Sequence, residues 1–343
     1  MPNISKSLNT SKRNKQDEFY TRRETIENEL QHYTSAFENK TVYCNCDDPE
    51  TSEFWKFFVR VFQSWHLKKL IATHYDYNEK NYAYKLELTQ DPGGHVSVND
   101  EPVKTPLPCN GDFRSAACIE LLKEADVVVT NPPFSLFREY IGQLMTYGKT
   151  FLVIGNLNAV TYKEIFPLLM ENKIWLGYHN GHTLFRVPDY YEIPDFYDKS
   201  DKSKLRSNGY VIDENGKLWR NLGNICWFTN IDIPKRHQNI DLRGNYYKPD
   251  LYPRYDNYDA IEVSKVDDTP CDYADAMGVP ISFIHKYSPD QFEILGCTES
   301  EGKGFSNGIW DEGSGVAQPL INGKKKYKRI FIRNKHPEAR RYV

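Results

Sequence analysis

Residues 126–134 carry the side chains best suited to chemistry. Their sequence, Asp-Val-Val-Val-Thr-Asn-Pro-Pro-Phe, places two prolines directly after a run of β-branched residues. Proline ends strand pairing and stiffens the chain, so Asn131 is expected at the carboxyl end of a strand, where ligands bind in open α/β sheets. Pro133 also pushes Pro132 into an extended conformation, which fixes the direction of its carbonyl. The Asn131 side-chain oxygen and the Pro132 carbonyl oxygen then form two rigid acceptors side by side.

This pair of acceptors suits a planar substrate with an exocyclic amino group. Both N–H bonds of the amine would donate to the two oxygens, which draws the nitrogen lone pair out of the ring's conjugation and makes it nucleophilic. Phe134 would stack on the ring. No strong general base is required, because the attacking atom is a neutral amine. The alternative is a simple turn capped by Asn131, which the β-branched strand and the second proline disfavour.

Alternating strand and helix patterns surround this segment. Strands are predicted at 41–44, 70–73, 126–130, 151–154 and 174–177, and helices at 25–37, 49–62, 115–124, 136–145 and 162–170. Asp48 is predicted as the N-cap of the second helix and Pro49 as its first residue. Residues 78–110 are polar and resemble an exposed hairpin or insertion. The alternation predicts an α/β fold with a doubly wound, mostly parallel sheet.

The pattern changes after residue 180. Short β-like runs at 184–187, 225–230 and 281–285 alternate with polar, aromatic-rich segments. A mobile loop is predicted at 198–222 and a strand at 328–333. The chain is therefore divided into a basic, disordered N-terminus (1–16), a catalytic domain (17–235) and a smaller C-terminal region (236–343).

Composition excludes several classes of protein. Of the 343 residues 39% are hydrophobic and 14% aromatic, which is enough for a core and excludes wholesale disorder. No apolar run approaches the roughly 18 residues of a membrane span, and the first twenty residues lack a signal-peptide core. The seven cysteines show no repeated spacing, so we expect reduced thiols and no metal site. A cytoplasmic protein is expected.

Charge is unevenly distributed along the chain. Residues 1–16 carry four basic residues and no acid, and residues 321–343 carry nine basic residues and one acid, although the whole chain has a net charge of −3. Basic ends on an acidic body suit a polyanion such as nucleic acid, with a solvated tail as the alternative. The candidates for phosphate contacts are Lys324, Lys325, Lys326, Lys328, Arg329 and Arg333.

The Asn131–Phe134 motif after such a strand resembles the catalytic motif of amino-group methyltransferases that use S-adenosylmethionine. Further segments, in order, resemble the EcoRI-type adenine-specific DNA methyltransferases: 17–21, 42–49, 111–115, 173–177, 253–258, 277–280 and 291–294. The resemblance spans about residues 15–335. It is therefore far more specific than one tetrapeptide.

The resemblance implies N6 methylation of an adenine in double-stranded DNA, in restriction–modification or in phage or host DNA protection. Asn131, Pro132, Pro133 and Phe134 would be the catalytic residues, and 236–343 the target-recognition region. The paired amine is unreachable inside the stack, so the base must swing out, at a cost of a few kcal/mol. Stacking on Phe134 would recover about 1–3 kcal/mol. No metal or stable protein partner is implied, although a cognate restriction endonuclease would be a genetic companion.

The resemblance also assigns the cofactor site. The loop after the first strand lacks the glycines usual in such enzymes, a departure that the EcoRI-type family shares. The methionine part is placed at this loop, on Cys44, Asn45, Asp47 and Asp48. Asp47 or Asp48 would face the ammonium, although Asp48 is equally well explained as a helix cap.

The remaining cofactor residues come from other segments. Asp112 would accept from the cofactor's adenine amine while Phe113 packs on the ring, and Asp76 is the candidate for the ribose hydroxyls. The N-terminal motif, which closes over the cofactor in the family, contributes Phe19, Tyr20 and Thr21. A turn aspartate and core aromatics are the alternatives for these positions.

Other readings of the chain remain open. The acceptor could be a protein glutamine, an RNA base or the cytosine amine, or the fold could be a DNA-binding module without activity. Phe185 and Trp227 are candidates for a second aromatic beside the extruded base, although core packing fits each of them better. The sequence-reading surface is expected within 236–343, with loops from 178–222.

Overall fold

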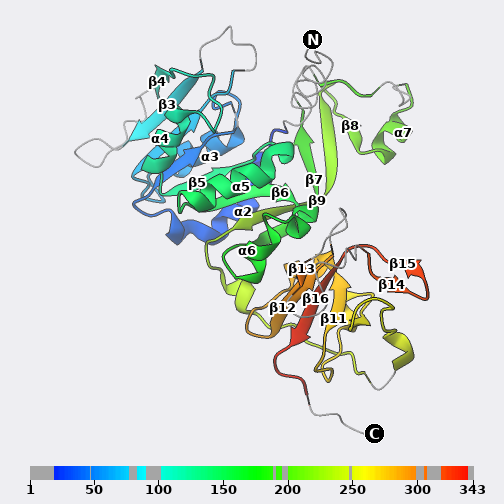
Figure 1. Cartoon of the computed structure of the whole chain (residues 1–343). Coiled ribbons are helices and arrows are strands. Elements are labelled where there is room, and N and C mark those ends of the chain that lie inside the picture. The colour runs from blue at the N-terminus through cyan, green and yellow to red at the C-terminus, as the bar shows by residue number, and fades with distance from the viewer. Residues whose placement is uncertain are drawn as a thin grey trace, which may run out of the picture. The chain divides into compact units, whose positions relative to one another are not determined.

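The structure is a computed structural model that describes residues 19–46, 48–76, 83–89, 102–187, 191–194, 200–246, 249–298, 305–306 and 318–338. The predicted disordered segment 1–16 lies outside these residues. The chain divides into two compact units (Figure 1). The first comprises Met1–Asn156 and Gly177–Ile231, and the second comprises Leu157–Leu176 and Asp232–Val343.

The first unit is built on one mixed sheet. Its described strands have the order β4-β3-β2-β1-β5-β6-β9-β7, with β8 paired to β9. The strands are β1 (Thr41–Cys44), β2 (Lys69–Thr73), β3 (Tyr84–Thr89), β4 (Val103–Pro106), β5 (Val127–Thr130), β6 (Thr150–Asn156), β7 (Trp175–Arg186), β8 (Tyr210–Ile212) and β9 (Leu218–Thr229). In the described sheet β2, β1, β5 and β6 pair parallel with one another, while β3 pairs antiparallel with β2 and β4, and β9 pairs antiparallel with β6 and β8. The sheet is therefore mixed around a parallel core, and not mostly parallel.

Burial explains the central position of β1 and β5. Every residue of both strands is buried, as a strand covered on both faces requires. The described helices of this unit are α2 (Arg23–Leu30), η1 (Gln31–Ala36), α3 (Glu53–Val61), α4 (Ala116–Glu124), η2 (Phe134–Leu136), α5 (Phe137–Thr146) and α7 (Lys202–Ser207). Ser115 caps α4, because its hydroxyl accepts from the Cys118 amide at 3.3 Å. None of the helices in the described ranges is long and apolar enough to cross a membrane.

The predicted start of the second helix is wrong. Helix α3 begins at Glu53, and its cap is Ser52, whose hydroxyl accepts from the Phe54 amide at 3.2 Å. Asp48 instead opens a turn, where its carbonyl accepts from the amides of Thr51 and Ser52 at 3.0 and 2.7 Å. The aspartate-proline pair is equally compatible with a turn, which is the structure it adopts here.

Three other predicted segments differ from the structure. The predicted strand at 184–187 is not separate, since it is the end of the long strand β7. The described part of the predicted loop at 198–222 contains α7, β8 and the start of β9. The run at 281–285 is the 3-10 helix η7, because a short apolar run alone does not distinguish a strand from a helix. The predicted insertion at 78–110 adds β3 and β4 to the edge of the sheet.

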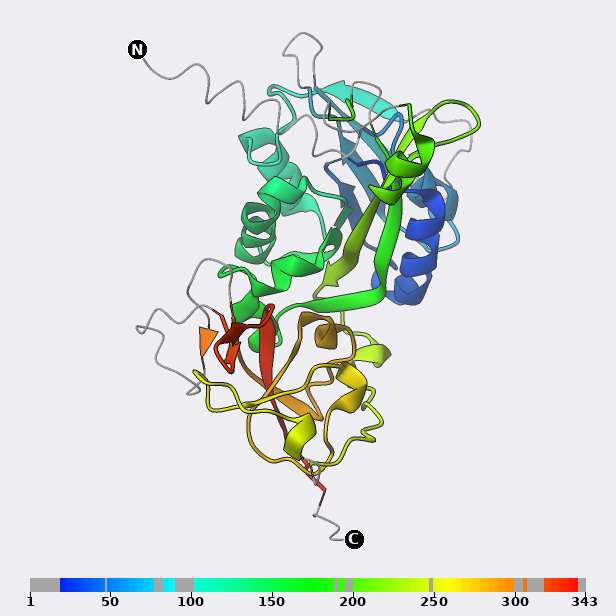
Figure 2. The same cartoon turned by 90° about the vertical axis from the view of Figure 1, so that its right-hand side faces the viewer.

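The second unit contains a smaller sheet (Figure 2). Among the described residues its order is β10-β11-β16-β12-β13, with one parallel pair, β10 and β11. The elements are η3 (Leu157–Thr161), α6 (Phe166–Met170), η4 (Pro234–His237), η5 (Pro249–Leu251), β10 (Ile261–Glu262), η6 (Val266–Asp268), β11 (Met277–Pro280), η7 (Ile281–His285), β12 (Phe292–Cys297), β13 (Phe305–Ser306), β14 (Leu320–Ile321), β15 (Lys324–Lys325) and β16 (Arg329–Asn334). Tyr255, Tyr258, Leu295 and Phe331 form part of its core.

Candidate active site

Asn131 lies at the carboxyl end of β5 with its side chain almost buried. It is 6% exposed, and its Nδ2 donates to the Phe19 carbonyl at 2.6 Å. Its Oδ1 is buried and has no hydrogen-bond partner in the part of the chain that the structure describes. Among the described residues no donor reaches the Pro132 carbonyl either, while the Pro133 carbonyl accepts from the Leu136 amide at 3.0 Å. The chain thus presents two free oxygens at the positions where the motif predicts acceptors.

Aromatic rings gather beside this amide. The ring of Phe19 lies 5.8 Å from that of Phe134, 5.9 Å from that of Phe185 and 6.3 Å from that of Tyr191, centroid to centroid. Phe134 is only half-buried, as a ring that receives a ligand needs to be. The second aromatic candidate, Trp227, is 1% exposed and packs edge-on against another core ring, so it does not join this group.

The N-terminal segment is fixed to this site through its backbone. Tyr20 forms a β-bridge with Arg186 at the end of β7, with N–O distances of 2.8 and 3.1 Å in the two directions. Thr21 is 3% exposed, and its hydroxyl is buried without a partner. A segment far away in sequence therefore lies directly against the Asn131 amide.

The loop after β1 contains most of the residues predicted to hold the methionine part. Cys44 and Asn45 are buried, and Asn45 Oδ1 accepts from the Tyr140 hydroxyl at 2.5 Å. Asp48 Oδ1 accepts from the Tyr84 hydroxyl at 3.1 Å. Asp47 lies outside the described residues. Parallel pairing of Val42 with Val127 makes β1 and β5 neighbouring strands, about 4.8 Å apart, so this loop begins beside the carboxyl end of β5.

The loop before α4 closes against the end of β2. The Asp76 amide donates to the Asn110 carbonyl at 2.8 Å, and Asp76 itself is 6% exposed. Gly111 has a φ of 80°, and a Cβ at this position would lie 2.1 Å from the His74 carbonyl oxygen. Only glycine permits this approach, which brings Asp112 to the carboxyl edge of the sheet.

Asp112 is an ionised side chain with a strong internal partner. Both of its oxygens accept from the Arg114 guanidinium, at 2.9 and 2.6 Å. Burial raises the pKa of Asp112, but the hydrogen bonds from the Arg114 side chain and backbone outweigh burial, and the pKa is lowered. Next to it, Phe113 is 6% exposed and packs edge-on against Tyr140, with ring centroids 5.1 Å apart.

Sequence reasoning missed two buried residues, of which Tyr140 joins these loops and Glu29 ties α2 to β7. Tyr140 is fully buried and contacts both Asn45 and Phe113. Glu29 is fully buried on α2 and accepts from the amides of Tyr178 and His179 on β7, at 2.7 and 2.8 Å. The signal for Glu29 was present, since it stands three residues after Ile26, on the apolar face of its helix.

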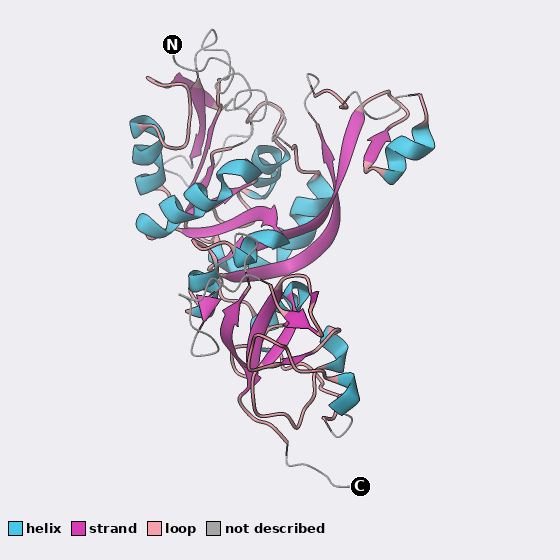
Figure 3. Cartoon of the chain, turned by 45° about the vertical axis from the view of Figure 1, so that its right-hand side comes forward, coloured by secondary structure: helices cyan, strands magenta, loops and turns pink. Residues whose placement is uncertain are grey.

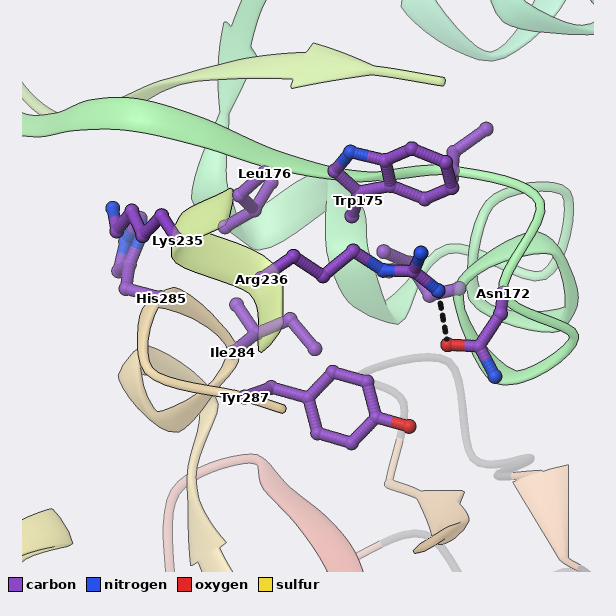
Figure 4. A pocket seen from close by; sticks show the side chains of 10 residues that line it. Asn172, Trp175, Leu176, Lys235, Arg236, Ile284, His285 and Tyr287 are labelled. Atoms are coloured by element: carbon purple, nitrogen blue, oxygen red, sulfur yellow. Dashed lines mark hydrogen bonds between the residues drawn. The ribbon is translucent and has the colours of Figure 1, made fainter. Parts of the chain in front are cut away.

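One hollow of the structure shares Tyr20 and Thr21 with the candidate site, and another lies apart from it. A cleft of about 730 Å³ in the first unit is lined by Tyr20, Thr21 and Arg186 together with charged residues of α2 and α3. A pocket of only about 20 Å³ in the second unit is filled by Arg236, which lies between Trp175 and Tyr287 (Figure 4). Its guanidinium carbon is 4.0 Å from the Trp175 ring centre, and Nη2 donates to Asn172 at 2.9 Å. This pocket is too small for a nucleoside and is a structural contact.

The six C-terminal cations do not share one environment. Lys328 is 8% exposed and donates to the Thr161 hydroxyl at 3.0 Å. Arg329 is 9% exposed and forms a two-point ion pair with Glu262, at 2.6 and 2.9 Å. Both side chains are engaged by partners inside the unit, Lys328 just before strand β16 and Arg329 on its first residue. Lys324, Lys325 and Arg333 are exposed, and Lys326 is partly so.

Comparison with known proteins agrees with the motifs over nearly the whole chain. The family model described as adenine-specific methyltransferase EcoRI matches residues 7–335. The type II methyltransferase M.EcoRI of Escherichia coli is 43% identical, over 96% of this chain and 97% of its own. M.MgeORF184P of Mycoplasma genitalium is 38% identical over 95% and 98%, and M.MpnI of Mycoplasma pneumoniae is 36% identical over 96% and 98%. No solved structure gives a significant match. The chain therefore belongs to the EcoRI family of adenine-specific DNA methyltransferases, the type II enzymes of restriction–modification systems.

Proposed function

We propose that the chain methylates the N6 amino group of an adenine extruded from double-stranded DNA, with S-adenosylmethionine as methyl donor. One observation carries this proposal. The Asn131 amide nitrogen donates a hydrogen bond to the Phe19 carbonyl, which fixes the orientation of the amide. The amide oxygen is then buried, and no described residue donates to it. An unsatisfied buried acceptor costs about 1–3 kcal/mol, which a donor from the substrate would recover.

The two free oxygens would bind the two N–H bonds of the adenine amine. Asn131 Oδ1 and the Pro132 carbonyl lie on consecutive residues of a stretch stiffened by two prolines, so they need little reorganisation when the amine arrives. Acceptance of both N–H bonds makes the nitrogen lone pair available for attack. Phe134 would stack on the base, with Phe19 and Phe185 closing the apolar side of the slot. These rings explain how an extruded base is retained.

The residues at the carboxyl edge fit S-adenosylmethionine. The buried carboxylate of Asp76 suits the ribose hydroxyls, Asp112 and Phe113 suit the adenine, and the loop from Cys44 to Asp48 suits the methionine part. The unpartnered Thr21 hydroxyl offers a further polar contact. When bound, the cofactor supplies the methyl group that the polarised amine receives. The sheet would then be of the doubly wound methyltransferase type, with residues 17–235 as catalytic domain and 236–343 as target-recognition region.

DNA phosphates would be held by the exposed cations of the C-terminal region. Lys324, Lys325 and Arg333 are the best placed, with Lys326 beside them. Such contacts supply affinity and salt dependence without base choice. In a restriction–modification or DNA-protection role, a separately encoded endonuclease would share the target sequence.

The test is chemical identification of the product. We expect N6-methyladenine when the protein, S-adenosylmethionine and unmethylated duplex DNA are incubated, digested to nucleosides and measured by mass spectrometry. The control is the same reaction with Asn131→Ala. Parallel reactions offer RNA or protein in place of DNA. Detection of N4-methylcytosine, a methylated RNA base or a methylated glutamine, without N6-methyladenine, would identify a different acceptor. If the protein binds DNA but none of these products forms, the result would support a DNA-binding module without activity.

A second experiment tests the cofactor site at Asp112. Asp112→Asn removes the carboxylate that we assign to the cofactor's adenine amine, so the dissociation constant for S-adenosylmethionine should rise about 10- to 100-fold, the loss expected for one hydrogen bond to a charged group. Isothermal titration calorimetry measures it. The matched control is Glu139→Gln, because Glu139 also binds Arg114, at 3.2 Å, from the exposed side. Equal losses in both variants would assign the effect to Arg114 and remove Asp112 from the site.

A further inference from the structure

The outer halves of β7 and β9 form a ribbon that leaves the sheet (Figure 3). Strand β6 pairs with β9 only from Ile225 to Thr229. Before that point β9 has β7 on one side and the short strand β8 on the other. Asn224, with a φ of 56°, stands where the exposed half of β9 meets the buried half. We define the ribbon as residues 178–186 and 218–224. Its residues are more exposed than the buried part of β9 that pairs with β6.

The exposed side chains of this ribbon are polar, and most of them make no hydrogen bond to another described residue. Asn180, His182, Asn221 and Asn224 are exposed, and none makes a side-chain hydrogen bond within the described part of the chain. The His182 ring lies across Gly223 on the neighbouring strand, where a Cβ would be 3.3 Å from it. A ribbon that only supported the sheet would have an apolar face to bury, but here polar groups cover the exposed positions.

The charge of the ribbon fits a polyanion. It carries two arginines, Arg186 and Arg220, and no aspartate or glutamate, in a chain whose acids outnumber its lysines and arginines. Helix α7 and β8 follow at its far end, where Lys202, Lys204 and Arg206 lie on α7 (Figure 1). These cations favour a negatively charged partner, while the carboxylates that contact the ribbon, Asp213 at Trp219 and Glu29 at His179, are each held by a ribbon side chain.

The ribbon is also continuous with the active site. Phe185, on the same strand, packs against the Phe19 ring at 5.9 Å, and Arg186 bridges to Tyr20. His182 is three residues before Phe185, about 10 Å along the strand. An adenine held against Phe134 thus belongs to a duplex whose neighbouring base pairs lie within reach of the ribbon.

We propose that this ribbon enters a groove of the target duplex and reads base edges next to the extruded adenine, with Asn180 and Asn221 as direct readers. The proposal rests on the proposed function. The major groove admits a two-stranded β-ribbon, and asparagine pairs with adenine N6 and N7 through two hydrogen bonds, worth about 1–3 kcal/mol of discrimination. The ribbon thereby supplies base choice, which the C-terminal cations do not.

The experiment uses Asn180→Ala and Asn221→Ala in the full chain. Both side chains are exposed and without partners, so neither variant should lose stability. The matched control is Asn28→Ala, an exposed asparagine on α2 that also makes no side-chain hydrogen bond within the described ranges. The substrate is a duplex library randomised on both sides of a central adenine, and both bound and methylated sequences are read by sequencing.

We expect each ribbon variant to lose base preference at one position by about 5- to 150-fold, with an unchanged salt dependence of binding, because the lost contacts are to bases and not to phosphates. Asn28→Ala should match the wild type. Unchanged preference at every position in both ribbon variants would overturn the proposal. If the wild-type protein selects sequences but methylates no adenine, the proposed function alone is refuted, because the binding data still test the ribbon. If the protein does not bind DNA, the proposed function and the ribbon proposal are both overturned.

Discussion

Asn131→Ala should lose methyl transfer almost completely while it retains S-adenosylmethionine. In the wild type the Asn131 oxygen is buried, held by the hydrogen bond from Nδ2 to Phe19, and free to accept from the substrate amine. Removal of one such preorganised group from an active site lowers the rate by about 100- to 1000-fold. Single-turnover transfer of a labelled methyl group to duplex DNA measures the chemical step, and calorimetry measures cofactor affinity separately.

A neighbouring residue provides the control for this substitution. Thr130 is fully buried, and its hydroxyl also lacks a partner, so Thr130→Val keeps the shape and leaves no new unsatisfied group. It should transfer methyl groups at nearly the wild-type rate. If Asn131→Ala remained within tenfold of the wild type, Asn131 would not be an acceptor in the reaction. If it lost cofactor affinity as well, collapse of the loop would explain the loss.

The sequence indicated the catalytic segment well because its constraints are local. A β-branched strand followed by Asn-Pro-Pro leaves the backbone few choices, and β5, its central place and the exposure of Phe134 follow from the pattern. The orientation of the Asn131 amide was not predictable in this way. It depends on the carbonyl of Phe19, which is 112 positions away in sequence and arrives only because Tyr20 pairs with the end of β7.

Long-range partners also decide which of the C-terminal cations are buried and which are exposed. The strand predicted at 328–333 is present as β16, at Arg329–Asn334. Its charged residues looked alike in sequence, yet Arg329 is buried against Glu262 while Arg333 is exposed beside Glu293. Arg329 and Arg333 are four positions apart, so strict alternation along the strand predicts the same face for both. Their different burial follows from the buried acid on β10, which is a property of the fold. The number of lysines and arginines in a basic run therefore gives only the maximum number of cations that could contact DNA.

Arg329→Met should destabilise the protein by about 3–5 kcal/mol without reducing the salt dependence of DNA binding. Glu262 is 1% exposed and receives two hydrogen bonds from Arg329 and one from the Tyr255 hydroxyl. Loss of the arginine leaves a buried carboxylate without its counter-charge, which is among the costliest single changes in a core. Urea unfolding followed by circular dichroism measures the free energy of unfolding. Glu262→Gln in the same chain should restore much of the loss, because it removes the uncompensated charge.

The stability that the Arg329–Glu262 ion pair contributes should depend on pH. Burial raises the pKa of Glu262, but the hydrogen bonds from Arg329 and Tyr255 outweigh burial and lower it. The ion pair therefore stabilises the fold above the pKa of an unfolded glutamate, about 4.3, and this contribution is lost as pH falls through the lower folded value. The gap in stability between wild type and Arg329→Met should be full at neutral pH and should narrow as the pH falls, because the uncompensated Glu262 of the variant takes up a proton first and the wild type then loses its ion pair.

Arg333→Met is the matched control, four positions after Arg329 on the same strand. Its ion pair with Glu293, at 3.3 Å, is exposed on both sides, so its loss should cost no more than about 1 kcal/mol. If Arg333 holds a phosphate, the slope of log affinity against log salt should fall by about one in this variant and stay unchanged in Arg329→Met. The opposite assignment, a lower slope in Arg329→Met with unchanged stability, would mean that the buried ion pair opens to bind DNA.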